Sequence, residues 1–445
     1  MSRHETFNFK DKSDLLQKAK ELGVMLPFQE SLDPLFEDCR IGSVKISNRF
    51  AIQPMEGFDA GGNGSPGELT FRRYRRYAAG GSTLIWFEAT SVSSQGRSNP
   101  RQLWIHSKSL DAFKRCVDET RKTARENFGD KQELFLVLQL THSGRYSKPE
   151  GRPEPRIVCH NPYLDNSGND PVILTDDDLR YLRDTYIETI ELAHEAGFDA
   201  VDIKACHGYL IHELLGARER KNSRYGGTFE NRIRFLTEIV DRGRHVQPGI
   251  QTALRLSASG SMPHPYDFGG NAGENGGMDL TEPVSLIRLL IEKGCSLLNI
   301  TVGDPHHKSH YSRPFDRPLP GRELPDEHPL EGIWRLLDAT ADLQKQFQDI
   351  PFVGTGYSWL RQFLPNVGAA VLNRKMAALI GLGRCAFAYP DAPRDLMETG
   401  FMDRKKVCIT CSQCTQRMRD SKSTGCVIRD GDLYNIKEIP QDRTP

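Results

Sequence analysis

Residues 175–204 read TDDDLRYLRDTYIETIELAHEAGFDAVDIK and contain, in one stretch, the unit that repeats along the chain. Thr175 followed by three aspartates is a helix N-cap signature, because the hydroxyl accepts a hydrogen bond from a free backbone N–H and the acids face the positive end of the helix. Apolar residues then recur at helical spacing and end in a short apolar run. We therefore predict a helix over Thr175–Ala196 and a buried strand over Ala200–Lys204.

The same alternation of short strand and longer helix extends from about residue 35 to about residue 400. The other predicted strands are Phe50–Gln53, Thr83–Phe87, Leu134–Leu140, Thr252–Ser257, Leu297–Thr301, Phe352–Gly354 and Ala378–Gly381. The other predicted helices are Asp111–Asn127, Thr228–Arg244, Glu282–Lys293 and Gly332–Gln348. Eight strands, most followed by a helix, predict an α/β protein with a parallel (β/α)8 TIM barrel rather than an open sheet.

Two segments flank the predicted barrel at residues 35–400. Residues 1–34 are polar with weak helical spacing and predict an N-terminal helical arm. Residues 401–445 form a small Cys-rich extension. The Gly-rich stretch YDFGGNAGENGGMDL (266–280) follows the fifth strand and is interpreted either as a mobile lid or as a plain surface loop.

Composition narrows the class of protein. The chain has 445 residues, of which 27% are charged, and a formal net charge of zero. This balance does not indicate a nucleic-acid or membrane-surface partner. The start, MSRHETFNFKDKSDLL, lacks the apolar core of a signal peptide, and no run of about 18 apolar residues could span a membrane. We expect a cytoplasmic protein with reduced thiols.

Four of the ten cysteines are clustered near the end of the chain, in CITCSQCTQRMRDSKSTGC (408–426). The Cys-x2-Cys-x2-Cys-x11-Cys spacing is formed by Cys408, Cys411, Cys414 and Cys426. Such compact runs are typical of iron–sulfur ligation. Zinc sites more often use two separated pairs, so zinc is the alternative. The spacing predicts a redox cluster behind the barrel.

Active sites of barrels lie where the strands end, and polar residues follow several of the predicted strands. Gly-rich turns after strands 7 and 8 let backbone N–H groups approach a phosphate, and Arg384 can pair with it. Gln139 could bind a pyrimidine-like edge, and the Arg255 guanidinium could stabilise the anion that a reduced flavin becomes. Lys204, His207 and Tyr209 are expected to share a pocket at the end of the fourth strand. This pattern indicates a flavin phosphate site.

The stretch HGYLIHELLGARERKNSRYGGTFENRIRFLTEIV (207–240) resembles the signature of the old yellow enzyme (NADH:flavin oxidoreductase) family of FMN-dependent oxidoreductases. Supporting matches occur in family order at NRFAIQPM (48–55), FEATSVSSQGR (87–97), QLTHSGR (139–145), ALRLS (253–257) and GLGR (381–384). The cysteine run resembles the subgroup that contains 2,4-dienoyl-CoA reductase and trimethylamine dehydrogenase, in which a [4Fe–4S] site follows the barrel.

The resemblance implies roles for named residues. Gln139 and Arg255 would contact the flavin ring, and Ala89 would pack near it. The flavin phosphate would be held by Gly356, Tyr357, Gly383 and Arg384.

The family's proton donor falls on Tyr209, and its substrate-carbonyl pair falls on Lys204 and His207. His306 or His307 lies near the extra active-site histidine of the dienoyl reductases, and the choice between them is open.

The sequence departs from the family at several positions. Lys204 replaces a usual histidine and would favour an enolate or carboxylate. Glu56 stands beside the flavin where a small residue is usual, so it must turn away or pair. The gap between Cys411 and Cys414 is one residue short of the subgroup pattern. No G-x-G-x-x-G follows a strand, so we expect a member without the subgroup's C-terminal FAD and NAD domains.

We therefore predict an FMN-dependent ene-reductase that reduces the activated C=C bond of an α,β-unsaturated carbonyl or carboxyl compound. A [4Fe–4S] cluster would relay electrons to FMN from NADH, NADPH, a ferredoxin or another flavoprotein. One alternative is an amine dehydrogenase of the trimethylamine dehydrogenase type, and another is a zinc-stabilised barrel without a redox cluster. The substrate, the electron donor and the oligomeric state are open.

Overall fold

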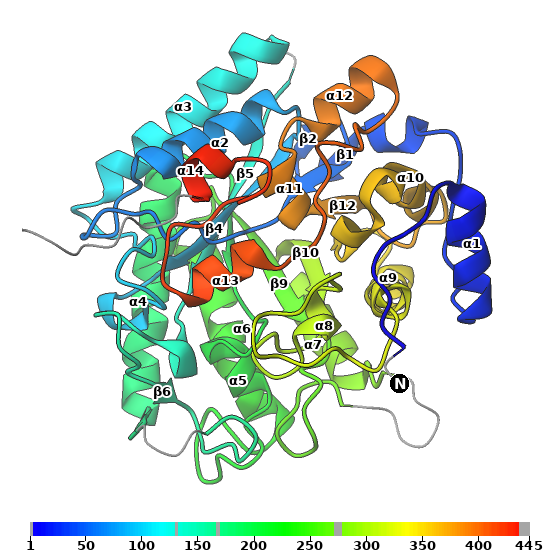
Figure 1. Ribbon diagram of the computed structural model, residues 1–445. Coiled ribbons are helices and arrows are strands. Elements are labelled where there is room, and N and C mark those ends of the chain that lie inside the picture. Colours follow the sequence, from blue (N-terminus) through cyan, green and yellow to red (C-terminus); the bar gives the residue numbers. More distant parts are fainter. Residues whose placement is uncertain (1–2, 130–131, 166–169, 271–277, 436–445) are drawn as a thin grey trace, which may run out of the picture.

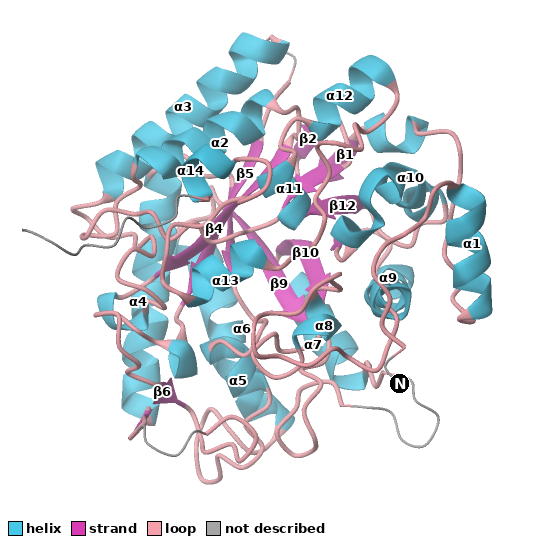
Figure 2. Cartoon of the chain, viewed as in Figure 1, coloured by secondary structure: helices cyan, strands magenta, loops and turns pink. Residues whose placement is uncertain are grey.

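The computed structural model describes residues 3–129, 132–165, 170–270 and 278–435. Eight parallel strands close into a barrel in the order β10-β11-β12-β3-β4-β5-β8-β9 (Figures 1 and 2). The strands are β3 (Phe50–Ile52), β4 (Leu84–Ser91), β5 (Phe135–Thr141), β8 (Ala200–Ile203), β9 (Gln251–Ser257), β10 (Cys295–Thr301), β11 (Phe352–Gly354) and β12 (Leu379–Leu382). All eight match predicted strands, so the prediction of a (β/α)8 TIM barrel is confirmed.

Helices surround this barrel (Figure 2). They are α2 (Glu68–Ala79), α3 (Leu110–Phe128), α4 (Asp176–Glu195), α5 (Leu210–Leu215), α6 (Phe229–Val246), α7 (Thr281–Glu292), α9 (Pro329–Gln346), α10 (Leu364–Asn373), α11 (Arg384–Ala388) and α12 (Ala392–Thr399). The predicted cap is present on α4, where Thr175 and Asp178 exchange hydrogen bonds. The sequence prediction missed α2, in which four arginines obscure the apolar stripe, and α10, which is apolar on most sides.

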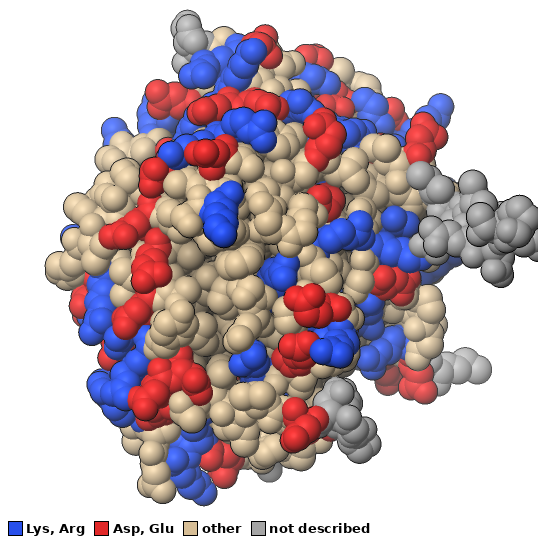
Figure 3. Space-filling model, turned by 90° about the vertical axis from the view of Figure 1, so that its left-hand side faces the viewer, with Lys and Arg blue, Asp and Glu red and all other residues tan. Residues whose placement is uncertain are grey.

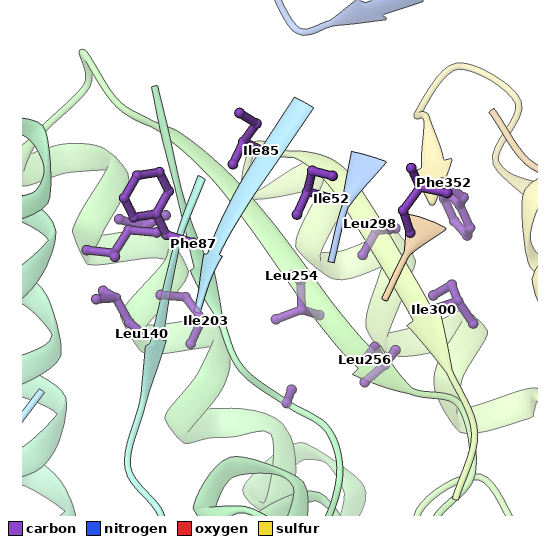
Figure 4. Packing of buried hydrophobic residues seen from close by; sticks show 14 of the residues in the cluster. Ile52, Ile85, Phe87, Leu140, Ile203, Leu254, Leu256, Leu298, Ile300 and Phe352 are labelled. Atoms are coloured by element: carbon purple, nitrogen blue, oxygen red, sulfur yellow. The ribbon is translucent and has the colours of Figure 1, made fainter. Parts of the chain in front are cut away.

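Alternate residues of each strand point to opposite sides of the barrel wall. In β4, Ile85 and Phe87 face the helices and belong to the large outer core (Figure 4). Leu84 and Trp86 face the barrel axis and pack with inward residues of the other strands. The apolar runs of the sequence are therefore strands buried on both faces, as parallel barrel strands are.

A hairpin of β1 (Cys39–Ile41) and β2 (Val44–Ile46) closes one end of the barrel. Its side chains Cys39, Ile41 and Ile46 belong to the same buried cluster as the inward residues at or near the beginnings of the strands. The hairpin thus covers the N-terminal end of the barrel, and the opposite, C-terminal end is left for the site.

The N-terminal segment packs on the outside of the barrel, beside α9 and α10 (Figure 1). It contains α1 (Lys12–Glu21), whose N-terminus is capped by the Asp11 carboxylate. The Phe7 ring meets Trp359 edge-on, with ring centroids 5.2 Å apart. Arg3 forms an ion pair with Glu331 at 2.9 Å.

The C-terminal segment returns across the barrel and carries α13 (Gln413–Arg419) and α14 (Gly431–Tyr434) (Figure 1). The Thr424 N–H donates to the Gly57 carbonyl at 2.6 Å, which ties this segment to the loop after β3. Asp430 accepts from Arg72 at 2.7 and 3.0 Å and from Arg76 at 2.8 Å. Both contacts fix the segment against α2 and the site.

The remaining elements are short. They include α8 (Ser309–Ser312), a two-stranded pair of β6 (Arg156–Ile157) and β7 (Val172–Ile173), and several 3-10 helices. Of the Gly-rich stretch 266–280, residues 271–277 lie outside the described residues. Within the described ranges, no helix combines the length and apolar character needed to cross a membrane.

Candidate active site

A cavity of about 470 Å³ opens at the C-terminal ends of the barrel strands. The polar character of its floor follows from the two-residue alternation of side chains along the strands. Ala51, Val137 and Ala253 are inward and apolar near the strand beginnings. Two residues further along, the same inward faces carry Gln53, Gln139 and Arg255, and these three line the cavity. The barrel interior therefore changes from an apolar plug to a polar floor within one repeat of each strand.

Asp202 orients this polar floor from a fully buried position on β8. Its Oδ2 accepts from Gln139 Nε2 at 2.6 Å and from Trp86 Nε1 at 2.9 Å, and its Oδ1 accepts from the Arg255 N–H at 2.6 Å. Burial raises the pKa of Asp202, and the hydrogen bonds oppose that rise. The carboxylate fixes the amide of Gln139, so its carboxamide oxygen is left to accept from a ligand.

Lys204 and Glu56 form a buried pair on one wall. Lys204 Nζ lies 3.8 Å from Glu56 Oε1 and 3.6 Å from the ring centroid of Tyr209. Gln102 Nε2 donates a hydrogen bond to the same oxygen of Glu56 at 3.0 Å. Burial raises the pKa of Glu56, while Lys204 and Gln102 lower it. The unusual acid and the unusual lysine predicted from the sequence thus partner each other.

Tyr209 and His207 follow β8 and line the same cavity. Burial and the Glu56 carboxylate raise the pKa of Tyr209 well above its usual value, so the phenol is neutral. His207 has a φ of 62°, and its backbone N–H donates to Ser257 Oγ at 3.1 Å. Burial, with Arg255 and Lys204 nearby, lowers the pKa of His207 well below its usual value. Its imidazole is neutral and can donate one hydrogen bond.

His306, not His307, lines the cavity. Its ring stacks on Tyr146 with centroids 3.6 Å apart, and its backbone N–H donates to Asp304 Oδ1 at 2.8 Å. The Tyr146 hydroxyl donates to the other oxygen of Asp304 at 3.3 Å. Burial raises the pKa of Asp304 to about 7. Sequence reasoning missed the roles of Tyr146 and Asp304 because neither contact can be read from spacing.

The predicted phosphate end of the site is formed by the turns after β11 and β12. Gly356, Gly383 and Arg384 line the cavity. Gly356 has a φ of 100°, and a Cβ there would lie 2.7 Å from the Leu336 side chain, so this turn requires glycine. Arg384 Nη2 donates to the Pro314 carbonyl at 2.6 Å, whereas its buried Nη1 has no hydrogen-bond partner among the described residues.

Two residues that the sequence predicted to contact the cofactor lie outside the lining of the cavity. Ala89 and Tyr357 are completely buried and are not among the residues that line the cavity. The Ala89 carbonyl accepts from Gln102 Nε2 at 3.0 Å. Contacts of these two residues with a flavin remain predictions.

The four clustered cysteines line a second cavity of about 20 Å³. The Sγ of Cys408 accepts from the Thr410 N–H, and the Sγ of Cys426 accepts from the Arg429 N–H, each at 3.4 Å. Arg384 lies in the wall of both cavities. Among the described residues, no three His, Cys, Asp or Glu side chains are grouped closely enough to enclose one metal ion.

Comparison with known families identifies the chain. Residues 34–275 match the NADH:flavin oxidoreductase / NADH oxidase family, which is more than half of the sequence. The chain belongs to this family. The family consists of flavin-dependent oxidoreductases, so the recognition made from 207–240 and its supporting motifs is confirmed.

Curated members of the family include an NADPH dehydrogenase of Clostridium acetobutylicum, 30% identical over 50% of this chain and 64% of its own length. An NADH oxidase of Thermoanaerobacter brockii is 26% identical over 91% of this chain and 58% of its own length. The chain therefore spans about six tenths of the length of these relatives.

Two solved structures share the fold. 2-Naphthoyl-CoA reductase superposes with a TM-score of 0.70 at 18% identity, over 89% of this chain and 57% of that one. Histamine dehydrogenase from Rhizobium sp. 4-9 superposes with a TM-score of 0.67 at 21% identity, over 89% of this chain and 52% of that one.

The cavity fits FMN, the flavin typical of this family. Its volume lies in the range of small-molecule sites. Arg255 Nε and Arg384 Nη1 are buried donors without partners among the described residues, one at the predicted ring end and one at the predicted phosphate end. Buried donors are normally satisfied, so both indicate that an anionic or electron-rich ligand belongs here.

Proposed function

We propose that the chain is an FMN-dependent ene-reductase acting on the activated C=C bond of an α,β-unsaturated carbonyl or carboxyl compound. The observation that carries this proposal is the convergence of a neutral phenol, a neutral imidazole and an ammonium group in one cavity. Tyr209, His207 and Lys204 line it together, next to the Gln139 and Arg255 floor.

Each of these groups would have a separate role in reducing the double bond. FMN, when bound and reduced, supplies the hydride that adds to the β-carbon. Tyr209 supplies the proton for the α-carbon, so that two C–H bonds replace the π bond. His207 and Lys204 hold the carbonyl or carboxyl oxygen, where negative charge develops in the transition state. Glu56 keeps Lys204 beside the Tyr209 ring instead of leaving it free to move.

We further propose that Cys408, Cys411, Cys414 and Cys426 hold a [4Fe–4S] cluster. Backbone N–H donors to cysteine sulfur support this assignment, since such bonds tune iron–sulfur sites. A single zinc ion bound by the same four sulfurs is the alternative, and metal analysis distinguishes the two. The cluster, when bound, supplies one-electron transfer. NADH, NADPH or a ferredoxin-type carrier is the proposed source of electrons.

An amine dehydrogenase is the second candidate, favoured by the fold shared with histamine dehydrogenase. Its cationic substrate would enter a cavity whose wall carries Lys204, and like charges repel. No tryptophan lines this cavity among the described residues, although an aromatic wall is what binds a cationic amine best. The ene-reductase is therefore preferred.

Replacing Tyr209 with phenylalanine tests the proposal. Tyr209→Phe should slow reoxidation of the reduced flavin by 2-cyclohexenone about 100-fold, the usual size of a general-acid contribution. Reduction of the flavin by NADPH should change far less. Stopped-flow absorbance measures both half-reactions, and Tyr181→Phe, at a residue 74% exposed, is the matched control. An equal loss in both half-reactions would remove the assigned role.

A further inference from the structure

The cavity wall is strongly cationic, although the whole chain has no net charge. One lining residue is acidic, Glu56, and it is already paired with Lys204. Seven lining residues are Lys or Arg, namely Lys148, Lys204, Arg255, Arg313, Arg322, Arg384 and Arg419. The outer surface differs, since Figure 3 shows both signs of charge interspersed over the face that it presents. The excess of positive charge is a property of the cavity.

FMN would account for part of this excess. Arg255 faces the ring end and Arg384 the phosphate end, as described above. Arg322 and Arg419 line the cavity and are exposed, so they lie at its mouth. Lys148 lines the same cavity and is half-buried. Within the described part of the chain, none of these three cations has a carboxylate within 4 Å. The mouth therefore holds positive charge that neither the protein nor the flavin balances.

The mouth cations come close enough to disturb one another. Although Arg419 is exposed, partial desolvation at the cavity wall and then the charge of Arg322 lower its pKa. The pKa of Arg313 is lowered to about 9 by burial and then by Arg384 and Arg419. Guanidinium groups held together against their mutual repulsion are stabilised when an anion joins them.

These cations also surround the groups that act on the substrate. The pKa of His306 is lowered to about 3, first by burial and then by nearby positive charges. These charges are on Arg419, Arg313, Lys204 and Lys148. His306 lies 6.1 Å from Tyr209, measured between ring centroids. Cations of the cavity wall thus lie near enough to the proposed proton donor to contact a reactant that extends from it.

We propose that Arg322, Arg419 and Lys148 form a second anion-binding site, which takes a carboxylate or phosphate carried by a reactant at the end remote from its reacting atoms. The proposal rests on the ene-reductase function and specifies its substrate class. Two reactants could carry the anion: the unsaturated acceptor or the pyrophosphate of a nicotinamide nucleotide. Arg419 comes from α13, so the Cys-rich segment would supply part of the substrate pocket.

Binding of two saturated analogues to the FMN-loaded protein tests the site without turnover. The probes are a cyclohexanone with a carboxyalkyl tail and its methyl ester, titrated by calorimetry. We expect the acid to bind at least tenfold more tightly than the ester, and Arg419→Gln or Arg322→Gln to reduce that preference about tenfold, as one charge-assisted hydrogen bond would. Arg152→Gln, at an 82% exposed side chain, should leave the preference unchanged. Salt should weaken binding of the acid more than of the ester.

A second arm identifies the source of the anion. Stopped-flow reduction of the flavin by NADPH gives the dissociation constant of the nucleotide in the same variants. A tenfold weakening there, with no change in the acid-to-ester preference, assigns the site to the nucleotide. If neither the acid preference nor nucleotide binding depends on Arg322 or Arg419, the anion site is overturned. Failure to reduce the unsaturated ester would instead overturn the ene-reductase proposal, and the binding preference would still report on the anion site.

Discussion

The two cavities that share Arg384 differ in how much of their chemistry the protein provides by itself. The larger one presents fixed donors and acceptors, such as Gln139 held by Asp202. The smaller one presents four thiols, two of which accept hydrogen bonds from backbone N–H groups, beside Arg384 and Arg429. The larger cavity can therefore select its ligand by hydrogen bonding and charge, whereas the chemistry of the smaller one would come from the proposed inorganic centre. Two variants test how independent the two cavities are, and a third tests a buried carboxyl group next to the larger one.

The largest effect is expected from Cys414→Ser. Loss of one thiolate should lower the iron content from about four atoms per chain to near zero, because the cluster needs all its ligands. FMN should remain bound, since its proposed contacts lie in the other cavity. Iron analysis and visible absorbance measure the two cofactors separately, and Cys159→Ser, at a cysteine outside both cavities, is the control. Zinc in place of iron would contradict the cluster, and parallel loss of FMN would show that the cavities are coupled.

A smaller effect is expected from Arg384→Gln at the shared wall. Removing a buried charge that pairs with a phosphate costs about 2–3 kcal/mol, which corresponds to a roughly 30- to 150-fold weaker affinity for FMN. Fluorescence titration of the flavin-free protein measures this change. The matched control is Arg429→Gln, because Arg429 lines the cysteine cavity alone. If both variants weaken FMN equally, Arg384 has no special role at the phosphate.

The smallest effect is expected from Asp304→Asn, and it depends on pH. The pKa of Asp304 is raised to about 7 in the folded protein, from 3.8. The folded state therefore keeps a proton that the unfolded state loses, so stability falls as pH rises from about 4 to about 7. Asparagine removes this loss.

The difference in Tm between Asp304→Asn and wild type should thus rise by roughly 3 °C from pH 5 to pH 8, equivalent to about 2.6 kcal/mol. Thermal unfolding at the two pH values measures it. Asp177→Asn, at an 80% exposed side chain, should show no such pH-dependent difference. A difference that is the same at both pH values would mean that Asp304 is ionised in the folded protein.

The sequence predicted the barrel well because its signal is local. A capped helix followed by an apolar run, as in 175–204, is visible within thirty residues. The positions of Gln139 and Arg255 were also predictable, because residues near strand ends face the barrel mouth.

Other site residues depend on long-range contacts, which local patterns do not contain. Asp202 resembles any acid in a strand until its register places it beside Gln139 and Trp86. Arg419 and Arg322 meet at the mouth from segments almost a hundred residues apart, and no spacing rule connects them. The choice between His306 and His307 required the path of the loop after β10.

The helix α13 has a further consequence, since it carries Cys414 near its start and Arg419 at its end. Seven helical residues cover only about 10 Å, so a shift of Cys414 would also move Arg419. If the proposed cluster and anion site exist, damage to the cysteine site would then also alter which molecules the barrel accepts.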